Sequence, residues 1–570
     1  MPLPTKTIHQ IESSLARAVG GSENEPGIAV GIAQGGRMVW GGARGLANLQ
    51  SQQVFSTRTP FRICSISKQF SCALVMREVA AGRIDLSAHP SRYVPWTRAL
   101  DPGLTILHLM QNKSGIRDQW VMAMMMGARA EQRFTLDNGV TAMKHAPASM
   151  WTPGSQNLYC NGNFEILGEV LARVTRQRVA TLLEIHIFNP LGMHDSALAV
   201  DTSVPVAGDA RGYRYINGAW EEEENRIHWG ASAGIVSTIE DLLKWAACLR
   251  DPQAAGLPWV AAITRAAPFN DGNAAIYASG INHAISHAGN HLRKSKRDML
   301  AHAGALRGWR STLMHFVNED TSIAVFMNRT NSPRGKLVRG VANEILAALK
   351  IAPIWQGQAK AVGAKLPRLA AGTYVSREQG LLIQLRERNG VAEVFSHLDW
   401  SALSAVVARG DGEHNVMATD DGHLQLSFDL PSQLRLTMRE ENVHTVMQSV
   451  KPMRPASGPF RSGGRFECRP IKSRVEVFVS NANAGTANAG TARASNANAG
   501  NIVELAFTGM FGEGVRYSLT VVNDEIAWFD LSRGVDESPP GRVLVRYDAA
   551  EDALELSCML ARRMVFRRGR

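Results

Sequence analysis

Ser65 and Lys68 are the first pair of residues whose types and spacing could do chemistry, and they lie in the segment Cys64–Phe70. A serine at the start of a helix and a lysine one turn later project from the same face of that helix. The serine could attack a carbonyl, and its own amide at the positive end of the helix could stabilise the resulting oxyanion. A helix-capping serine beside a solvated lysine has the same pattern, so this pair alone does not decide the function.

The residues around this pair predict one large α/β domain over residues 1–350. Apolar runs beside turn residues predict strands near both ends of this region, at Ile28–Ala33, Met38–Trp40, Thr312–Phe316 and Ile323–Met327. Helical patterns lie between them, as in Phe70–Ala81 and Ile239–Leu249. Strands at both ends with helices between them predict a single sheet that the returning strands complete.

The remaining residues predict two small antiparallel β-barrel domains, 367–455 and 456–570, after a linker at 351–366. Short strands dominate there, at Leu381–Leu385, Val391–Phe395, Leu424–Phe428 and Leu434–Met438. The second barrel contains an Asn/Ala/Gly-rich tract at 481–501. This tract cannot bury enough apolar surface to order itself, so we expect a loop without an assigned role.

The composition excludes several other classes of function. Of the 570 residues 45% are hydrophobic and 20% charged, which is typical of a soluble globular protein. No apolar run approaches the ~20 residues of a membrane-spanning helix, and residues 1–20 lack the apolar core of a secretion signal. The net charge of +11 comes from basic residues dispersed among acidic ones, and the six cysteines lack paired metal-site spacing. We expect a cytoplasmic protein that binds neither nucleic acid nor membrane and uses no metal or organic cofactor.

Three motifs in chain order resemble those of the serine beta-lactamase and penicillin-recognising enzyme superfamily. Cys64–Phe70 resembles its nucleophile motif, Tyr159-Cys160-Asn161 its Tyr-x-Asn motif, and His302-Ala303-Gly304 its Lys/His-x-Gly strand motif. The resemblance covers the first 350 residues and implies an α/β (α+β) beta-lactamase-like catalytic domain.

The same short patterns occur elsewhere in the chain. Tyr215-Ile216-Asn217 is also Tyr-x-Asn, but the following Gly218 predicts a hairpin turn. His228-Trp229-Gly230 and His287-Ala288-Gly289 are also His-x-Gly, but neither is followed by the turn and strand that follow His302. We therefore expect Tyr215 to be structural and take His302 as the residue of the strand motif.

Longer stretches of the motifs are similar to the D-stereospecific aminopeptidases of this superfamily, in Cys64–Phe70, Tyr159–Phe164 and Gly304–Arg310. This resemblance implies a serine hydrolase that releases N-terminal D-amino acids, with D-Ala preferred, from peptides, amides or esters. It also implies two C-terminal β-barrel domains and a homodimer. Alanines at 301 and 303, where that branch has glycines, are expected to narrow the cleft beside the substrate.

The resemblance also implies a catalytic role for each of five residues. Ser65 attacks the carbonyl and forms an acyl-enzyme, and Tyr159 donates a proton to the leaving amine. Asn161 orients Lys68 and the substrate carbonyl, while His302 positions the substrate or modulates Tyr159. Lys68 and Tyr159 both remain candidates for the base, because a reference pKa of ~10 must be perturbed in either case.

Substrate contacts are implied in the same way. The backbone N–H groups of Ser65 and Ala305 would form the oxyanion hole, beside Gly304. Residues 535–541 resemble a loop that presents an aspartate, here Asp536, to the free amine of the substrate; a plain acidic β-turn is the alternative.

Two alternatives to a D-aminopeptidase remain open. A beta-lactamase, a DD-carboxypeptidase or a short-chain esterase would keep the same machinery and act on another substrate. A catalytically silent penicillin-binding-like protein would belong to another class of function.

Overall fold

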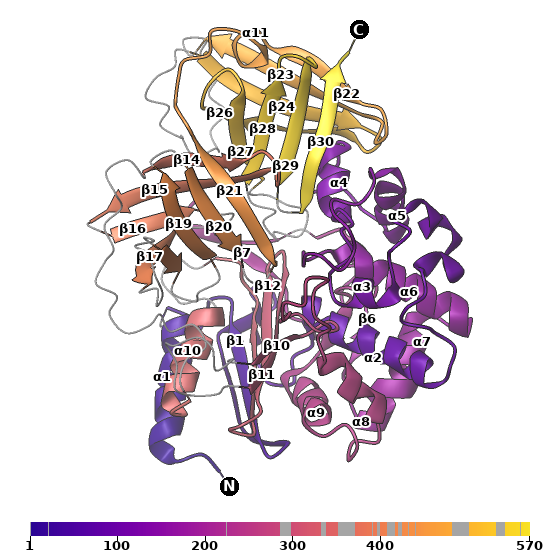
Figure 1. The fold of residues 1–570 in the computed structure, drawn as a ribbon. Helices are drawn as coiled ribbons and strands as arrows, with labels where there is room; N and C mark the ends of the chain where they lie inside the picture. The colour runs from indigo at the N-terminus through magenta and orange to yellow at the C-terminus, as the bar shows by residue number, and fades with distance from the viewer. Residues whose placement is uncertain are drawn as a thin grey trace.

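The structure is a computed structural model. It describes residues 2–20, 22–223, 225–285, 298–331, 338–351, 371–389, 391–395, 400–406, 416–419, 424–430, 433–438, 441–481, 501–531, 542–558 and 560–569. These residues form a mixed α/β domain followed by two β domains, which lie above it in Figure 1. The predicted architecture is confirmed.

The α/β domain is built on a six-stranded antiparallel sheet in the order β10-β11-β12-β13-β1-β2. Its strands are β1 (Ile28–Gln34), β2 (Arg37–Arg44), β10 (Asn282–Ile285), β11 (Asp298–Leu306), β12 (Trp309–Phe316) and β13 (Thr321–Met327). Gly35 and Gly36 have positive φ angles and make the turn between β1 and β2. Strand β13 returns to pair with β1, with Ile28 opposite Met327, so the predicted completion of the sheet is confirmed.

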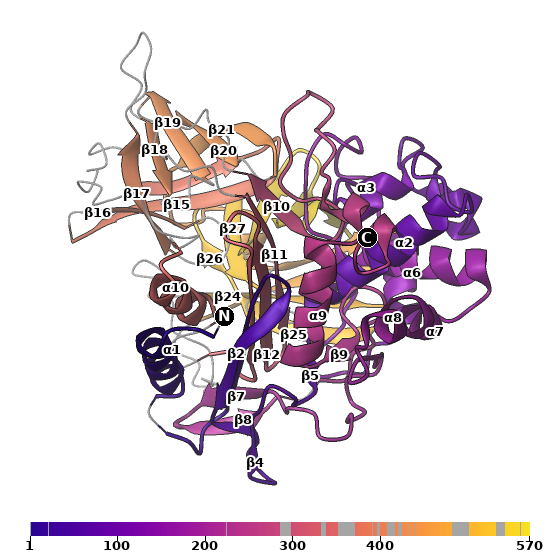
Figure 2. The ribbon, with the colours of Figure 1, turned by 90° about the horizontal axis from the view of Figure 1, so that it is seen from below.

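Helices cover both faces of this sheet, as Figures 1 and 2 show. Helices α1 (Thr5–Ala18) and α10 (Val338–Ala348) lie on one face, and α9 (Ile239–Arg250) lies on the other beside α2 (Ser67–Ala80). Alternate residues of β1 serve the two faces: Ile28, Val30 and Ile32 pack toward α1 and α10, while Ala29 and Ala33 join the larger core.

The larger core contains the helices that carry the site. They include α3 (Ile106–Met110), α4 (Gln119–Met125), α5 (Leu136–His145), α6 (Asn161–Thr175), α7 (Val179–Leu183) and α8 (Asn189–Leu191). Smaller strands complete the domain, namely β3 (Leu46–Asn48), β4 (Gln53–Val54), β5 (Phe61–Arg62), β6 (Ala197–Leu198), β7 (Tyr213–Ile216), β8 (Ala219–Glu222) and β9 (Ile235–Ser237). Ten of the fourteen residues of α2 are buried, so this helix lies inside the domain.

The first β domain is a closed barrel of eight antiparallel strands, in which β14 pairs with both β15 and β21. The strands are β14 (Gly372–Ser376), β15 (Leu381–Arg388), β16 (Val391–Phe395), β17 (Trp400–Val406), β18 (Val416–Thr419), β19 (Leu424–Leu430), β20 (Gln433–Met438) and β21 (Val443–Val450). Four of them contain the strands predicted from the sequence.

The second β domain is a nine-stranded antiparallel sheet whose outer strands are β25 and β26. Its strands are β22 (Gly464–Cys468), β23 (Ser473–Asn481), β24 (Asn501–Gly509), β25 (Gly512–Ser518), β26 (Thr520–Val521), β27 (Ile526–Asp530), β28 (Arg542–Asp548), β29 (Ala553–Cys558) and β30 (Ala561–Arg568), after the short helix α11 (Pro459–Ser462). Its apolar face joins the core cluster of the α/β domain.

Three predictions concern residues outside the described part of the chain. They are the linker beyond Ile351, the low-complexity tract between Asn481 and Asn501, and the loop at 535–541 with Asp536. They stay predictions.

Candidate active site

Ser65 lies in a single 3₁₀ turn, Cys64–Ile66, that leads directly into α2. The residue before it, Cys64, has a φ of 54°, which is the left-handed conformation that non-glycine residues rarely adopt. The Cys64 thiol donates a hydrogen bond to the Arg62 carbonyl at 3.1 Å. This turn leaves Ser65 half-buried while the residues on both sides of it are buried.

Lys68 is fully buried one turn after Ser65, and its Nζ contacts three oxygen acceptors. It lies 3.1 Å from Ser65 Oγ, 2.9 Å from Asn161 Oδ1 and 2.9 Å from the Ser232 carbonyl oxygen. The amide and carbonyl oxygens can only accept, so both take an N–H from Lys68. The third position faces Ser65, and there an ammonium donates a proton while a neutral amine presents its lone pair.

Tyr159 and Asn161 bring the second motif to this lysine. The Lys68 Nζ lies 4.7 Å from the Tyr159 ring centroid and 5.2 Å from that of Phe164. Asn161 is the first residue of α6, and its N–H donates to Asp118 Oδ2 at 2.9 Å. The motifs predicted that these residues act together, and the structure brings them around the buried Lys68 Nζ.

The turn that carries Ser232 is held by Glu165 on α6. Glu165 Oε1 accepts hydrogen bonds from the Gly230 N–H at 3.1 Å, from the Ser232 N–H at 3.4 Å and from the Ser232 hydroxyl. A Cβ at position 230 would clash with this carboxyl group, so a larger residue there would have to displace Glu165.

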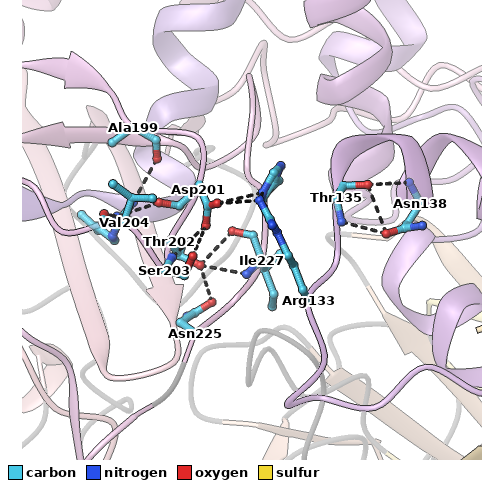
Figure 3. A network of polar contacts seen from close by, with 12 residues as sticks. Arg133, Thr135, Asn138, Ala199, Asp201, Thr202, Ser203, Val204, Asn225 and Ile227 are labelled. Carbon is cyan, nitrogen blue, oxygen red and sulfur yellow. Dashed lines mark hydrogen bonds and ion pairs between the residues drawn. The ribbon is translucent and has the colours of Figure 1, made fainter.

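A second polar network fixes the chain before this turn (Figure 3). Asp201 Oδ2 contacts Arg133 Nη2 at 3.2 Å and His228 Nε2 at 3.1 Å. The Thr202 hydroxyl accepts the Ile227 N–H at 2.9 Å. His228 therefore supports this part of the chain through its contact with Asp201.

His302 faces the site from β11, and its partner is a residue that the sequence did not single out. The Tyr277 hydroxyl lies 3.1 Å from His302 Nε2, and His302 Nδ1 lies 2.6 Å from the Ala303 carbonyl oxygen. A carbonyl only accepts, so Nδ1 carries the proton and Nε2 accepts from Tyr277. Burial and the nearby Lys68 lower the pKa of His302 to about 3, so its imidazole is neutral. Burial raises the pKa of the Tyr277 phenol well above its usual value.

Gly304 lets β11 approach the turn of Ser65. A Cβ at this position would clash with the Ser311 hydroxyl and the Ile63 carbonyl oxygen, and would lie 2.9 Å from the Cys64 Cβ. Ala305, the next residue, pairs with Arg310 on β12. Strand β10 pairs with β11 from Asp298 to Ala301, so the half of β11 that begins at His302 lies beyond that pairing.

The expectation that Ala301 narrows the cleft is wrong. Its methyl group packs with the cluster between the sheet and helices α1 and α10. Successive residues of a strand point to opposite faces, so Ala301 points away from the face that carries His302. Ala303 is exposed.

Both β domains contact the segments that carry the motifs. The Asp118 N–H donates to the Leu560 carbonyl at 3.0 Å, and the Arg117 guanidinium donates to the Arg562 carbonyl at 2.8 Å. From the first β domain, the Glu441 carbonyl accepts the Asn157 N–H at 3.0 Å. The segment before Tyr159 and the segment before α4 are therefore held from outside the α/β domain.

The structure thus brings Ser65, Lys68, Tyr159, Asn161 and His302 together. Asp536 lies outside the described residues. Sequence reasoning did not single out Asp118, Glu165, Ser232 or Tyr277, although all four lie within the first 350 residues, which resemble the superfamily. Within the described ranges no group of three metal-ligating side chains occurs, and none of the helices there is both long and apolar enough to cross a bilayer.

Comparison with known proteins adds the family context. The family model described as Beta-lactamase matches residues 13–347. The chain is 25% identical to the D-aminopeptidase of Gluconobacter oxydans over 550 residues, which covers 95% of this chain and 96% of that protein. It is also 25% identical to the D-aminopeptidase of Brucella melitensis over 556 residues, with the same coverage. Among solved structures, it resembles the octameric penicillin-binding protein homologue from Pyrococcus abyssi, with a TM-score of 0.53 and 16% identity over 77% of this chain and 100% of that chain.

Proposed function

Because the matching family model spans more than half of its length, the chain belongs to the beta-lactamase family, and we propose that it is a serine hydrolase that releases N-terminal D-amino acids. The observation that carries the chemistry is the contact of Lys68 Nζ with Ser65 Oγ at 3.1 Å. Two fixed acceptors, Asn161 Oδ1 and the Ser232 carbonyl, take the two N–H groups of a neutral Lys68 amine. The D-aminopeptidase relatives, similar over nearly the whole chain, support the substrate class.

In the acylation step, neutral Lys68 is the base. Its lone pair faces Ser65 because its two N–H groups are donated to Asn161 and Ser232. It takes the hydroxyl proton while Ser65 Oγ bonds to the substrate carbonyl carbon, and the resulting oxyanion lies at the N–H groups of Ser65 and Ala305. The carbon–nitrogen bond then breaks as the leaving amine takes a proton through Tyr159. Water hydrolyses the ester in a second step with the same base.

The strand side binds the substrate. The half of β11 that begins at His302 is available to pair with an extended peptide backbone, next to Gly304 and Ala305. His302 stays neutral at physiological pH. It therefore acts on the strand side of the site through its packing and its hydrogen bonds, and not through a charge. The free α-amine of the substrate lies one carbon from the scissile carbonyl. Once it is buried in the cleft this ammonium needs an anion, which we assign to Asp536.

Hydrolysis of D-alanine p-nitroanilide tests this function, with L-alanine p-nitroanilide, N-acetyl-D-alanine p-nitroanilide and a chromogenic cephalosporin in parallel. We expect turnover of the free-amine D-substrate alone, and none in Ser65→Ala. Cleavage of the blocked amide or of the cephalosporin would instead indicate an esterase or a beta-lactamase.

Asp536 has its own test. In Asp536→Ala we expect kcat/KM for D-alanine p-nitroanilide to fall by about 100-fold, because the substrate ammonium loses its partner. Glu537→Ala, the neighbouring acidic residue, serves as the matched control and should stay at the wild-type level. Undiminished activity of Asp536→Ala would remove this residue from the role.

We also propose that the enzyme is a cytoplasmic homodimer, as the D-aminopeptidase resemblance implies. Six buried free cysteines are compatible with a reducing compartment. Light scattering of the purified protein should give twice the chain mass of 62.0 kDa, and cell fractionation should recover it with the cytosol. A monomer mass would contradict the first statement, and recovery outside the cytosol would contradict the second.

A further inference from the structure

The two fixed acceptors of Lys68 are each held by a carboxyl group from another part of the fold. Asn161, which accepts through Oδ1, has its N–H bound to Asp118 Oδ2 at 2.9 Å. Ser232, which accepts through its carbonyl, has its N–H and its hydroxyl bound to Glu165 Oε1. Displacing either carboxyl group would release one of the acceptors that orient the Lys68 amine.

Asp118 is buried and supports the start of two helices. Its Oδ1 accepts the Trp120 N–H at 2.9 Å and caps α4, and its Oδ2 accepts the N–H of the first residue of α6. Cys160, the residue before α6, makes no capping hydrogen bond with its own side chain. A carboxylate suits this place because both helix N-termini carry a partial positive charge.

Glu165 lies one turn after Asn161 on α6 and is half-buried. Its three hydrogen bonds to the 230–232 turn all end on Oε1, so an oxygen at that position holds the turn whether or not the group carries charge. Glu165 can therefore have two separate roles: its oxygen holds the turn, and its negative charge acts on Lys68. A glutamine can keep the oxygen acceptor while it removes the charge.

Several titratable groups of the described residues interact with Lys68. They include Cys72, Asp118, Cys160, Glu165 and His302, and the Tyr159 ring packs against the Lys68 amine. Burial raises the pKa of both thiols, which keeps them neutral, and His302 is neutral as well. Removal from water raises the pKa of Asp118 and Glu165, and the Lys68 ammonium opposes that rise. Asp118 and Glu165 are thus two acidic groups of the described residues that interact with Lys68.

We propose that Asp118 and Glu165 are positioning residues that hold Asn161 and Ser232 around Lys68 and, as carboxylates, set the pH at which its amine becomes the base for Ser65. The inference rests on the proposed function for the identity of the base, but not for the substrate. Removing a negative charge near Lys68 disfavours its ammonium form. The neutral amine then persists to lower pH, so the acid limb of the pH–rate profile moves to lower pH.

The test measures acylation of Ser65 by p-nitrophenyl acetate, as release of p-nitrophenol between pH 5 and 10, in the full-length protein and in Glu165→Gln and Asp118→Asn. Ser65→Ala gives the background rate. Glu169→Gln is the matched control: it makes the same change one turn further along α6, where the carboxylate binds Trp96 and Arg173 instead. Thermal unfolding of each variant shows whether it is folded.

We expect the acid limb to move to lower pH by about one pH unit in both variants and to stay in place in Glu169→Gln. An unmoved limb in Glu165→Gln or in folded Asp118→Asn would overturn the inference, as would an equal shift in Glu169→Gln. Wild-type acylation by the ester without cleavage of any D-amino acid amide would contradict the proposed function alone. A wild-type protein that the ester does not acylate would overturn the assignment of Ser65 and this inference together.

Discussion

The two sides of the active site are built on different principles. The helical wall consists of Ser65, Lys68, Tyr159 and Asn161, and the strand wall consists of Tyr277, His302, Gly304 and Ala305. On the helical wall the buried Lys68 amine contacts three oxygen atoms, and two carboxyl groups hold two of these acceptors, Asn161 and Ser232, in place. On the strand wall the titratable groups are neutral, because burial lowers the pKa of His302 and raises that of Tyr277.

This difference assigns proton transfer to the helical wall and the positioning of the reacting groups to the strand wall. A proton can be moved only where a group changes charge near the pH of the reaction, which the helical wall allows. The strand wall contributes a close backbone approach at Gly304 and a histidine whose tautomer is fixed by two hydrogen bonds. Substitutions on the helical wall should therefore change proton transfer. Substitutions on the strand wall should change the position of the oxyanion donor without changing the pH–rate profile.

The largest effect is expected for Lys68→Met, which keeps the length of the side chain and removes the base. We expect kcat/KM for D-alanine p-nitroanilide to fall by about 10³-fold, in the range that general-base catalysis contributes. Lys244→Met is the control, since that lysine lies at the surface and pairs with Asp241. A folded Lys68→Met enzyme that keeps a tenth of the activity would show that the helical wall does not supply the base, and Tyr159 would replace Lys68 in that role.

Gly304→Ala tests the strand wall. The added methyl group must push β11 away from the Cys64–Ile66 turn, which moves the Ala305 amide from the oxyanion. We expect kcat to fall by about 100-fold, as for loss of one oxyanion donor, without a shift of the pH–rate profile. In Gly103→Ala, where the nearest atom to the new Cβ is Asp101 Oδ1 at 3.3 Å, kcat should be unchanged. A shifted pH–rate profile in Gly304→Ala would show that the strand wall also affects proton transfer, and would contradict the distinction between the two walls.

The sequence predicts the groups of each wall that lie within a short motif. Ser65 with Lys68, Tyr159 with Asn161, and His302 with Gly304 are each two or three residues apart, so local spacing reveals them. The same holds for the strands, whose apolar runs and turns predict β1, β2, β12 and β13. The pairing of β13 with β1 also follows from the pattern, since strands at both ends must share one sheet.

Residues that support the motifs from a distance have no such signal. Tyr277 precedes His302 by 25 residues, and Glu165 acts on a turn 65 residues further along. Within α6, Glu165 has the spacing of an ordinary polar position on an amphipathic helix, and only the packing of the 230–232 turn gives it a role. The sequence also could not show which face of β11 carries Ala301, because the strand register depends on the neighbouring strands.

Arg117→Met tests whether the helical wall depends on the last domain. The buried Arg117 guanidinium donates to the carbonyl groups of Pro147, Ala148 and Arg562, next to Asp118. Leaving these carbonyls without a donor should cost about 1–3 kcal/mol of stability and lower kcat/KM by about 10-fold, through loosening of Asp118 and Asn161. Arg129→Met removes another hydrogen bond to that domain, to the Glu513 carbonyl, and should leave kcat/KM unchanged. Equal effects of the two substitutions would assign the loss to the interface in general.

The last prediction concerns stability instead of turnover, through the pH dependence that His302 contributes. Its pKa of about 3 in the folded protein lies below the ~6.5 of an unfolded chain, so below pH 6.5 the unfolded chain binds a proton that the folded chain does not. Unfolding is therefore favoured as the pH falls from 6.5 toward 3, by up to about 1.4 kcal/mol for each pH unit. His302→Asn removes this contribution, so its unfolding temperature should fall less steeply with acid than that of the wild type, even if it is lower at pH 7. His9→Asn, on the exposed side of α1, serves as the control and should follow the wild-type curve. Parallel curves for His302→Asn and the wild type would mean that His302 can be protonated in the folded protein, which would contradict a neutral strand wall.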